Sequence, residues 1–370
     1  MHRGEEKTLL GLSLQEFTEI VEHAGEPSYR GQQIFEAVYR QRVRSLDDLS
    51  TLPRLFREEL MRQGVSIGMP DIEKKFESGD GTVRYLLKLS DDQTVETVWM
   101  PEGDDGEAGD GTVAGDDQDQ RLKRATVCVS SQVGCAVDCR FCLTALLGVK
   151  RNLTAGEIVG QISTVLNDQN VSLPENRINI VFMGMGEPFL NYDNFMRAVL
   201  LLVEGVGIAA SRMTVSTAGI VPRISEFGAE AIRPKLAISL NASNDELRSR
   251  LMPLNRKWNL EKVISAARDF PLRNRERLTF EYVLLKDVND SIQNAREVVE
   301  LIRGIRAKVN LIALNPGPGI DFGTPAQEDV LAFQKILIAA GIPTFVRRPR
   351  GRDIYAACGQ LKRTVELQIA

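Results

Sequence analysis

The sequence predicts an α/β protein whose main body is a partial, open TIM-type barrel of parallel strands. From about residue 125 onward, β-branched segments alternate with amphipathic helical segments. Six such repeats follow one another, which favours a parallel sheet covered by helices. Polar residues and glycines stand where several strands end, and in a parallel barrel these ends share one face. The combination predicts both the fold and the place of a site.

The N-terminal part, residues 1–67, is expected to form a small helical domain. It contains three amphipathic segments, LQEFTEIVEHAG, RGQQIFEAVYRQ and LPRLFREELMRQG, each ending near Gly or a basic turn. Residues 68–123 then begin with three strand-like segments, IEKKFES, TVRYLLKLS and TVETVWMP, with SGDG at 78–81 as a hairpin turn. This second part ends in the acidic, glycine-rich stretch 103–119, which we expect to be a solvated, disordered loop.

Residues 124–370 contain the predicted barrel. Helical patterns lie between and after the strands, including TAGEIVGQISTVLN, DNFMRAVLLLVEG and QEDVLAFQKILIAAG. The six strands are expected at 125–130, 178–183, 212–217, 235–240, 278–285 and 308–314.

Composition limits the class of protein. With 370 residues and 43% hydrophobic content, the chain can bury a full core and a smaller additional domain. No apolar run approaches the roughly 18 residues that cross a bilayer, and the N-terminus is too acidic for a signal peptide. The five cysteines are too few for a disulfide scaffold. We therefore expect a cytoplasmic protein without a membrane segment.

The charge distribution is uneven. The net charge is −4, but residues 102–119 concentrate acidic residues, and the remaining chain is basic. Positive charge collects in four runs, at 40–44, 121–124, 273–277 and 347–352. Each run alone is typical of a solvated surface. Together they indicate nucleic-acid binding only if the fold brings some of them to one rim.

The most informative motif is the run CAVDCRFC, in which Cys135, Cys139 and Cys142 form a CxxxCxxC triplet. An iron–sulfur cluster held by three cysteines leaves one iron free for a substrate or cofactor. A closed zinc site needs a fourth thiolate or imidazole, and the two histidines, His2 and His23, stand far upstream. Half of a zinc ribbon, or three cysteines close by chance, is the alternative. The triplet indicates chemistry at iron.

Further polar residues follow the predicted strands. GMGEP, with Gly186 and Glu187, follows the second strand, and its glycines would let a backbone edge approach a ligand while Glu187 accepts from an ammonium or hydroxyl. Each of these features alone is also typical of an ordinary turn. Their convergence on the triplet favours a ligand site. The remaining candidates are Ser216 after the third strand, Ser239 and Asn241 after the fourth, and Asn315 after the sixth.

With these motifs, the chain resembles the radical S-adenosylmethionine (SAM) enzymes, and more closely the adenine-C2 RNA methyltransferases of the RlmN/Cfr family. The resemblance runs from the N-terminal helices to the end of the chain. It implies a [4Fe-4S] cluster whose free iron binds the amino acid moiety of SAM. The stretches that carry it are ATVCVSSQVGCAVDCRFC, GMGEPFLNYDN, TVSTAGIVP, AISLNASNDELRSRLMP and RGRDIYAACGQL.

The resemblance also implies roles for three residues outside the triplet. Cys358 is methylated by one SAM, and a second SAM yields a 5′-deoxyadenosyl radical that abstracts hydrogen from this methyl group, so that the carbon radical adds to C2 of adenine. Cys128 is the resolving thiol and leaves a transient disulfide with Cys358, and Glu96 is the proton acceptor. Radical addition is chemically reasonable because C2 of adenine is a poor nucleophile. Without the resemblance, two lone cysteines are typically buried small residues, and a strand glutamate typically faces solvent.

For SAM contacts, the resemblance implies Gly186, Glu187, Ser216, Ser239, Leu240, Asn241 and Asn315. The chain departs from the family pattern at two places. Asn241 stands where the family commonly has histidine, which matters for a side-chain contact and not for a backbone contact. The stretch 103–119 is an insertion, and it must loop outward for Glu96 to meet the cysteine segment.

The implied substrates are 23S ribosomal RNA and adenosine 37 of tRNAs, with an electron donor such as flavodoxin and a monomeric enzyme. The helical domain and the basic runs are the expected RNA surface, and Arg347 and Arg348 are expected to bind RNA and not SAM. Three alternatives stay open: a C8-methylating relative, a radical SAM enzyme acting on a peptide or small molecule, and a non-enzymatic iron–sulfur RNA-binding regulator.

Overall fold

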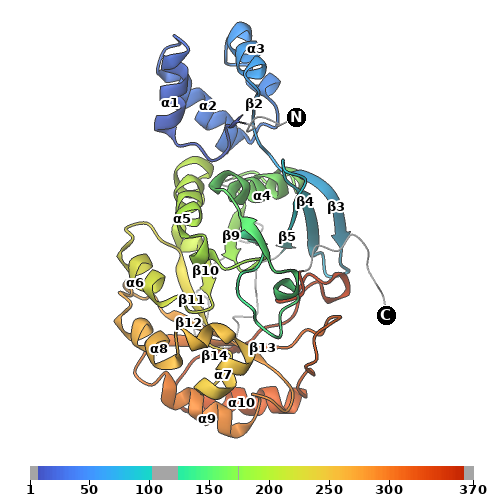
Figure 1. Ribbon diagram of the computed structural model, residues 1–370, viewed down its shortest axis with the longest axis vertical. Helices are drawn as coiled ribbons and strands as arrows, with labels where there is room; N and C mark the ends of the chain where they lie inside the picture. Colours follow the sequence, from blue (N-terminus) through green and yellow to red (C-terminus); the bar gives the residue numbers. More distant parts are fainter. Residues whose placement is uncertain (1–6, 102–123, 174, 362–370) are drawn as a thin grey trace.

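The computed structural model describes residues 7–101, 124–173 and 175–361 (Figure 1). Ten strands in these residues form one sheet in the order β14-β13-β12-β11-β10-β9-β6-β5-β4-β3. Strand β6 and the strands from β9 to β14 are parallel, and β3, β4 and β5 continue the sheet in antiparallel fashion. The sheet curves without closing, which confirms the open barrel. The bounds are β3 (Asp71–Glu77), β4 (Val83–Lys88), β5 (Thr94–Pro101), β6 (Arg124–Cys128), β9 (Arg177–Phe182), β10 (Met213–Thr217), β11 (Lys235–Ser239), β12 (Leu278–Leu284), β13 (Ala307–Ala313) and β14 (Thr344–Val346).

The six predicted barrel strands occur within about two residues of their expected bounds, but the sequence pattern missed a seventh. Strand β14 has three residues, TFV, and pairs in parallel with β13. Three residues are too few to display a period of two, so only the pairing identifies this strand. The acidic stretch 103–119 lies outside the described residues.

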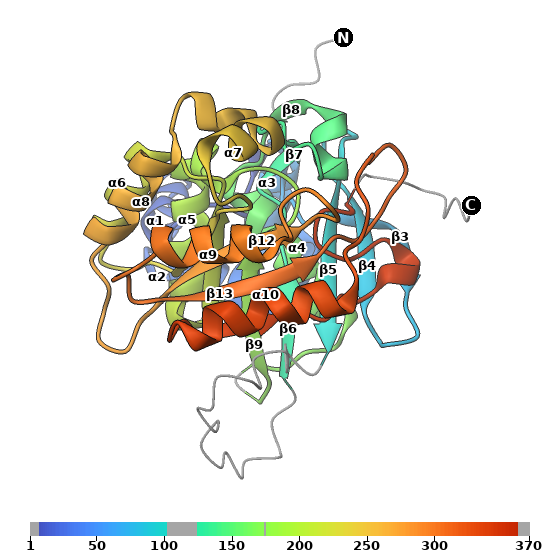
Figure 2. The ribbon, with the colours of Figure 1, turned by 90° about the horizontal axis from the view of Figure 1, so that it is seen from below.

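Helices cover the outer face of the parallel strands (Figures 1 and 2). Helix α4 follows the cysteine segment and begins with a capping box between Thr154 and Glu157. Helix α10 packs against β14 and α9. None of the described helices has both the length and the apolar composition needed to cross a bilayer. The bounds are α4 (Ala155–Asp168), α5 (Tyr192–Leu201), α6 (Val221–Ala229), α7 (Asp245–Leu251), α8 (Leu260–Asp269), α9 (Ile292–Leu301) and α10 (Gln327–Ala339).

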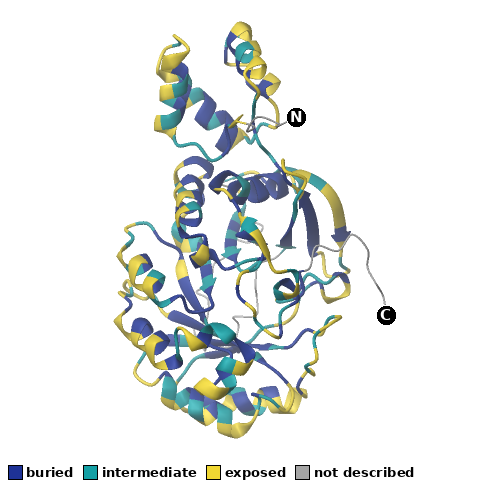
Figure 3. Ribbon diagram, viewed as in Figure 1, coloured by how far each residue is buried: buried dark blue, intermediate teal, exposed yellow. Residues whose placement is uncertain are grey.

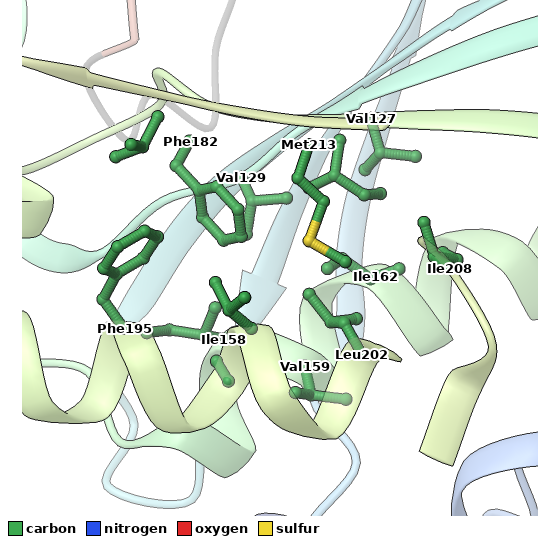
Figure 4. Close-up of a cluster of buried hydrophobic side chains, with 14 of the residues drawn as sticks. Val127, Val129, Ile158, Val159, Ile162, Phe182, Phe195, Leu202, Ile208 and Met213 are labelled. Carbon is green, nitrogen blue, oxygen red and sulfur yellow. The ribbon is translucent and has the colours of Figure 1, made fainter. Parts of the chain in front are cut away.

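The main core lies between the sheet and helices α4 and α5 (Figure 4). Alternate residues of the strands point toward the helices, because successive side chains of a strand face opposite sides. Val127 of β6, Phe182 of β9 and Met213 of β10 meet Ile158 and Ile162 of α4. This packing holds β6 and β9, whose ends carry the cysteine segment and the GMGEP turn, together with the adjacent strand β10.

The N-terminal helices α1 (Leu14–His23), α2 (Tyr29–Glu36) and α3 (Arg54–Arg62) stand beyond α4 and α5 at one end of the molecule, and their outer faces are exposed (Figures 1 and 3). Phe17, Phe35 and Tyr39 form an aromatic cluster, with ring centroids 4.8 Å apart for Phe35 and Tyr39. A short parallel pair, β1 (Lys7–Thr8) and β2 (Val65–Ser66), joins the beginning and end of this region.

Arg42 attaches the helical region to the barrel. Its Nε donates to Asn167 Oδ1 at 2.8 Å, and its Nη2 donates to the carbonyl of Val171 at 2.7 Å. Arg44 of the same basic run forms an ion pair with Asp71 at 3.2 Å. The run 40–44 therefore includes residues with structural roles.

The C-terminal segment crosses the open side of the barrel. After β14, Gly351 N donates to Asp80 Oδ2 at 3.0 Å, and Ser78 Oγ donates to Asp353 Oδ1 at 2.6 Å, so the segment reaches the turn between β3 and β4. It then returns to the cysteine segment, where Leu143 N donates to the carbonyl of Gly359 at 2.8 Å. These bonds bring Cys358 from the far end of the chain to the barrel interior.

Candidate active site

Two adjoining cavities occupy the barrel interior. The upper cavity, about 160 Å³, lies at the carboxyl ends of the strands and is lined by the three triplet cysteines together with Glu187, Ser216 and Asn241. The lower cavity, about 320 Å³, extends toward the amino ends of β10 and β11. The shared wall includes Cys142, Glu281, Asn315 and Cys358. The expected convergence of residues far apart in the sequence is therefore observed.

The cysteine segment is shaped by a small hairpin that the sequence pattern did not indicate. Strands β7 (Gln132–Gly134) and β8 (Val149–Asn152) pair in antiparallel fashion around the triplet. Gly134 has φ +82°, and a Cβ at this position would lie 1.8 Å from the carbonyl oxygen of Gly148. Cys135 N donates to that same carbonyl at 3.1 Å. The first cysteine is thus positioned by a close backbone contact that requires glycine.

The surroundings of the triplet are apolar. Val137, Phe141 and Met252 are buried there, and Cys135 and Cys139 pack against this group. Burial raises the pKa of the Cys135 thiol to about 12 and that of Cys139 well above its ordinary value, and the neighbouring thiols add to both shifts. Thiolates at these positions need a positive partner, which a metal centre supplies.

The donor set fits a cluster better than a single ion. Among the described residues, no group of three His, Cys, Asp or Glu side chains converges closely enough to hold one metal ion. A [4Fe-4S] cluster is bound differently, because each thiolate ligates a separate iron and the sulfur atoms stand further apart. Three cysteines lining one sheltered cavity meet that requirement, and the arrangement gives no support to the zinc alternative.

Glu187 is buried and held by neutral groups. Its Oε2 accepts from Ala218 N at 2.7 Å and its Oε1 accepts from Phe189 N at 3.0 Å. Burial raises its pKa to about 7, against the lowering effect of these hydrogen bonds. Gly186 has φ +98°, and a Cβ there would lie 2.6 Å from the backbone nitrogen of Gln132. The Oε1 of Gln132, which was not predicted from the sequence, accepts from Glu187 N at 3.0 Å and links the GMGEP turn to the cysteine segment.

The ends of β10 and β11 meet beside Glu187. Ser216 Oγ and Ser239 Oγ are 3.3 Å apart and both side chains line the upper cavity. Asn315 lines both cavities. The side chain of Leu240 is fully buried in the core and does not line either cavity, so a ligand contact at this residue would have to use its backbone.

Asn241, the departure from the family pattern, has a structural use for its side chain. Its φ of +56° is in the left-handed region, which Asn tolerates better than most residues. Its Oδ1 accepts from Val283 N at 2.9 Å, and its Nδ2 contacts Met252 Sδ at 3.3 Å. The side chain joins β11 to β12 at the edge of the cavity.

Arg248 is a buried cation that was also not predicted from the sequence. Its guanidinium donates to the carbonyls of Ala218 at 2.7 Å and of Ser239 and Leu240 at 3.1 Å. Burial lowers its pKa to about 10, although Cys139 lies near enough to oppose this shift. The segment NDELRSRLMP has the pattern of an ordinary exposed helix, and nothing in it distinguishes Arg248 from exposed Arg250.

Cys358 and Cys128 lie close to each other. Cys358 is exposed and lines both cavities, whereas Cys128 lines the lower cavity. Burial raises the pKa of the Cys128 thiol, and the proximity of Cys358 raises it further. Val98, Met185 and Leu361 form a small apolar cluster against which Cys128 packs. The two cysteines outside the triplet are thus neighbours in the fold.

Glu96 does not line either cavity. It is fully buried in β5, where its carboxylate forms an ion pair with Arg84 of the neighbouring strand β4. Its carbonyl accepts from Ser130 Oγ at 2.6 Å, which ties it to the segment after β6. The guanidinium of Arg84 lies 4.0 Å above the ring of Phe76.

Of the basic runs within the described residues, only 347–352 lines the interior. Arg347, Arg348 and Arg350 border the lower cavity, whereas Arg273 of the run 273–277 donates to the carbonyl of Arg233 at 3.0 Å. Two further cations, Arg212 and Lys235, border the same cavity. They stand singly in the sequence, so a search for charge runs misses them.

Comparisons with known proteins agree with this geometry. Residues 129–302 match the Radical SAM superfamily, and residues 7–65 match the ribosomal RNA large subunit methyltransferase N-terminal domain. The chain is 68% identical to the probable dual-specificity RNA methyltransferase RlmN of Koribacter versatilis, over 93% of this chain and 98% of that protein. It is 46% identical to the dual-specificity RNA methyltransferase RlmN of Syntrophobacter fumaroxidans, over 94% of this chain and 96% of that one.

A solved structure has a closely similar fold. The crystal structure of a radical SAM methyltransferase from Sphaerobacter thermophilus superposes with a TM-score of 0.86 at 42% identity, covering 97% of this chain and 100% of that chain. The superfamily match implies a [4Fe-4S] cluster and SAM, in agreement with the triplet and its apolar cavity. The chain therefore belongs to the RlmN family of RNA methyltransferases within the radical SAM superfamily.

Proposed function

We propose that this protein methylates C2 of adenosine in 23S ribosomal RNA and at position 37 of tRNAs. The observation that carries the proposal is the location of Cys358, which borders both the cavity of the cysteine triplet and the cavity lined by cations. A side chain in this position is able to receive a group on one side and meet an RNA base on the other. The names of the relatives as dual-specificity RNA methyltransferases support the substrate class.

Cys135, Cys139 and Cys142 would hold the cluster, and the residues at the strand ends would contact SAM. When bound, the cluster and two SAM molecules per turnover supply a methyl group and a 5′-deoxyadenosyl radical. Glu187 is suited to an ammonium group because burial removes competing water. The proposed contacts are Gly186, Glu187, Ser216, Ser239, Asn241 and Asn315, with Leu240 through its backbone.

Cys358 would carry the methyl group as a thioether and become joined to C2 of the base through that carbon. The thioether methyl would lose one hydrogen atom before it joins C2, and the joined product would give up the C2 proton and one electron, for which the cluster is the acceptor. Cys128 would then attack the Cys358 sulfur as a thiolate, the released carbon would take up a proton to become the methyl group, and the resulting disulfide would be reduced by an external thiol. The closeness of the two thiols supports this exchange.

Glu96 would accept the C2 proton. Because its carboxylate is paired with Arg84 outside both cavities, this role requires a rearrangement of β5 or of the C-terminal segment when RNA binds. Residues 1–67 would act as an RNA-binding accessory domain, 68–123 as an antiparallel extension, and 124–370 as the catalytic core. We further propose a cytoplasmic monomer reduced by a donor such as flavodoxin.

The test is nucleoside mass spectrometry of an rRNA fragment and of bulk tRNA after anaerobic incubation with reconstituted protein, SAM and reductant. We expect 2-methyladenosine with the unaltered protein and with Lys262→Gln, an exposed residue of α8, and none with Cys358→Ala. An 8-methyl product would contradict the proposed regiochemistry. Formation of 5′-deoxyadenosine without methylated RNA would contradict the proposed substrate.

A further inference from the structure

We infer that the lower cavity is the channel by which the target nucleotide reaches Cys358, with Arg212 and Lys235 binding the RNA phosphates at its mouth. The inference rests on the proposed function and adds the direction of RNA entry and two contact residues. RNA would enter from the amino ends of the barrel strands, opposite the cysteine triplet.

The strand positions set the direction of the channel. Arg212 immediately precedes β10, and Lys235 is the first residue of the adjacent parallel strand β11. The register pairs Thr214 with Lys235, so the two cations mark the beginning of the same strand pair. At the other ends of these strands, Ser216 and Ser239 line the upper cavity. The strand pair β10 and β11 thus contributes cations to the lower cavity and candidate cofactor-site residues to the upper cavity.

The charges of the two cavities differ in sign. The described lining of the lower cavity includes the cations Arg212, Lys235, Arg347, Arg348 and Arg350, with Glu281 as its acidic residue. The described lining of the upper cavity includes Glu187 and Glu281 and contains no lysine or arginine. A polyanion is attracted to clustered Lys and Arg, and releases counterions on binding them. The lower cavity is therefore the electrostatically favoured entrance for an RNA strand.

The lining of the lower cavity also includes groups suited to a base. Asn179, Thr126 and Thr214 offer neutral donors and acceptors, and Glu281 lies near Cys128 at the wall shared with the upper cavity. Adenine presents an exocyclic amine that donates and ring nitrogens that accept. A carboxylate accepts from such an amine, whereas hydroxyl and amide groups serve the ring nitrogens. The volume, about 320 Å³, admits one splayed nucleotide and not a duplex.

The two cations belong to the barrel wall and not to the C-terminal segment that carries Cys358. Removing their charge should therefore change RNA binding without moving the Cys358 thiol. Arg212→Gln and Lys235→Gln replace each charge with a neutral polar side chain. Arg296→Gln on α9 and Lys262→Gln on α8 are matched controls, because both residues are exposed on the outer helices. All variants would be reconstituted with the cluster and compared as holoenzymes.

The measurement is the dissociation constant of a single-stranded rRNA fragment as a function of salt concentration. Each charge removed is expected to weaken binding and to lower the slope of log K against log salt by about 0.7, and the double variant by about 1.4. Uncoupled formation of 5′-deoxyadenosine from SAM without RNA should stay unchanged, because the upper cavity is unaltered. The controls should keep the slope of the unaltered protein.

Two results would overturn the inference. One is an unchanged slope and affinity in the double variant while the unaltered protein methylates RNA, which would place the entrance elsewhere and leave the proposed function intact. The other is a loss of uncoupled SAM cleavage in the same variants, which would show that the lower cavity supports the cofactor site. Failure of the unaltered protein to methylate any RNA would instead contradict the proposed function itself.

Discussion

The charged side chains at the two ends of the barrel interior differ in their exposure to water. At the upper end, Glu187 and Arg248 are buried, and each is held by uncharged backbone groups. At the lower end, Lys235 and Arg348 remain exposed to water. Buried charges act strongly over short distances because the surroundings screen them little, whereas exposed charges act on a strand from solution and weaken with salt. The upper end therefore holds its charged side chains in a fixed geometry, whereas the lower end is suited to attracting a charged strand from solution.

The C-terminal segment connects the two environments. It contributes Arg347, Arg348 and Arg350 to the lower cavity and Cys358 to the shared wall. The bonds of Gly351 to Asp80 and of Leu143 to the Gly359 carbonyl hold it across the open side of the barrel. An open barrel is needed for this arrangement, since a closed one would exclude the segment from its interior.

The largest expected effect on activity comes from substituting the two cysteines at the boundary between the two ends, Cys358 and Cys128. Cys358→Ala and Cys128→Ala should each abolish formation of 2-methyladenosine, because the first removes the methyl carrier and the second the resolving thiol. They should differ in one respect: Cys128→Ala is expected to accumulate RNA covalently joined to the protein, seen as a shifted band on a denaturing gel. A covalent adduct with Cys358→Ala, or normal product with Cys128→Ala, would contradict the assigned roles.

The next effect tests the upper end. Arg248→Met should destabilise the protein by about 3 to 5 kcal/mol, because the carbonyls of Ala218, Ser239 and Leu240 lose a buried donor. Urea unfolding measures this change. Arg250→Met, two residues away and exposed, should stay within about 0.5 kcal/mol. Equal effects of the two substitutions would show that the buried guanidinium has no special role.

A smaller effect concerns Glu187 and pH. Its folded-state pKa of about 7 lies above its ordinary 4.5, so the folded protein binds more protons than the unfolded chain between these values. Its contribution to the free energy of unfolding therefore falls as pH rises from about 4.5 to 7 and is constant above. Relative to Glu187→Gln, the unaltered metal-free protein should lose about 2 to 3 kcal/mol between pH 5 and 8.

The control for this titration is Glu246→Gln, because Glu246 is exposed at the start of α7. Its difference from the unaltered protein should vary little over the same range. A pH-independent difference between the unaltered protein and Glu187→Gln would mean that Glu187 stays ionised throughout, held by its two backbone donors.

The smallest effect tests the lower end. Neutralising Arg347 and Arg348 with glutamine should weaken RNA binding and lower the salt slope by about 0.7 for each phosphate that the two arginines neutralise. SAM binding, followed by equilibrium dialysis, should be unchanged because neither residue lines the upper cavity. Unchanged RNA affinity would remove both residues from the RNA footprint, and weakened SAM binding would contradict the separation of the two ends.

Much of the upper end could be predicted from the sequence. The spacing of Cys135, Cys139 and Cys142 and the strand-to-turn position of GMGEP are local features, and strand ends converge whenever parallel strands form a barrel. Arg248 and Gln132 could not be predicted in this way. Their roles depend on carbonyls and amides supplied by other segments, and a hydrogen-bond partner distant in the sequence leaves no local pattern.

The lower end depended far more on tertiary structure. Arg212 and Lys235 are single cations at the beginnings of two strands, and only the pairing of β10 with β11 makes them neighbours. The run 273–277 is similar to 347–352 in the sequence, but Arg273 and Glu276 contact Arg233 instead of the cavity. Clustering in sequence and clustering in space are therefore poorly related for surface charges.

Local sequence patterns were sufficient for the fold class, for six of the seven parallel barrel strands and for the three candidate iron ligands, because hydrophobic periodicity and ligand spacing act over a few residues. Which side chains share a cavity was settled only by the packing of the whole chain. That packing brought Cys358 to Cys128, separated Glu96 from both cavities by pairing it with Arg84, and gave the two ends of the barrel interior different charge. These outcomes involve segments as much as hundreds of residues apart, where partner and burial are properties of the complete fold.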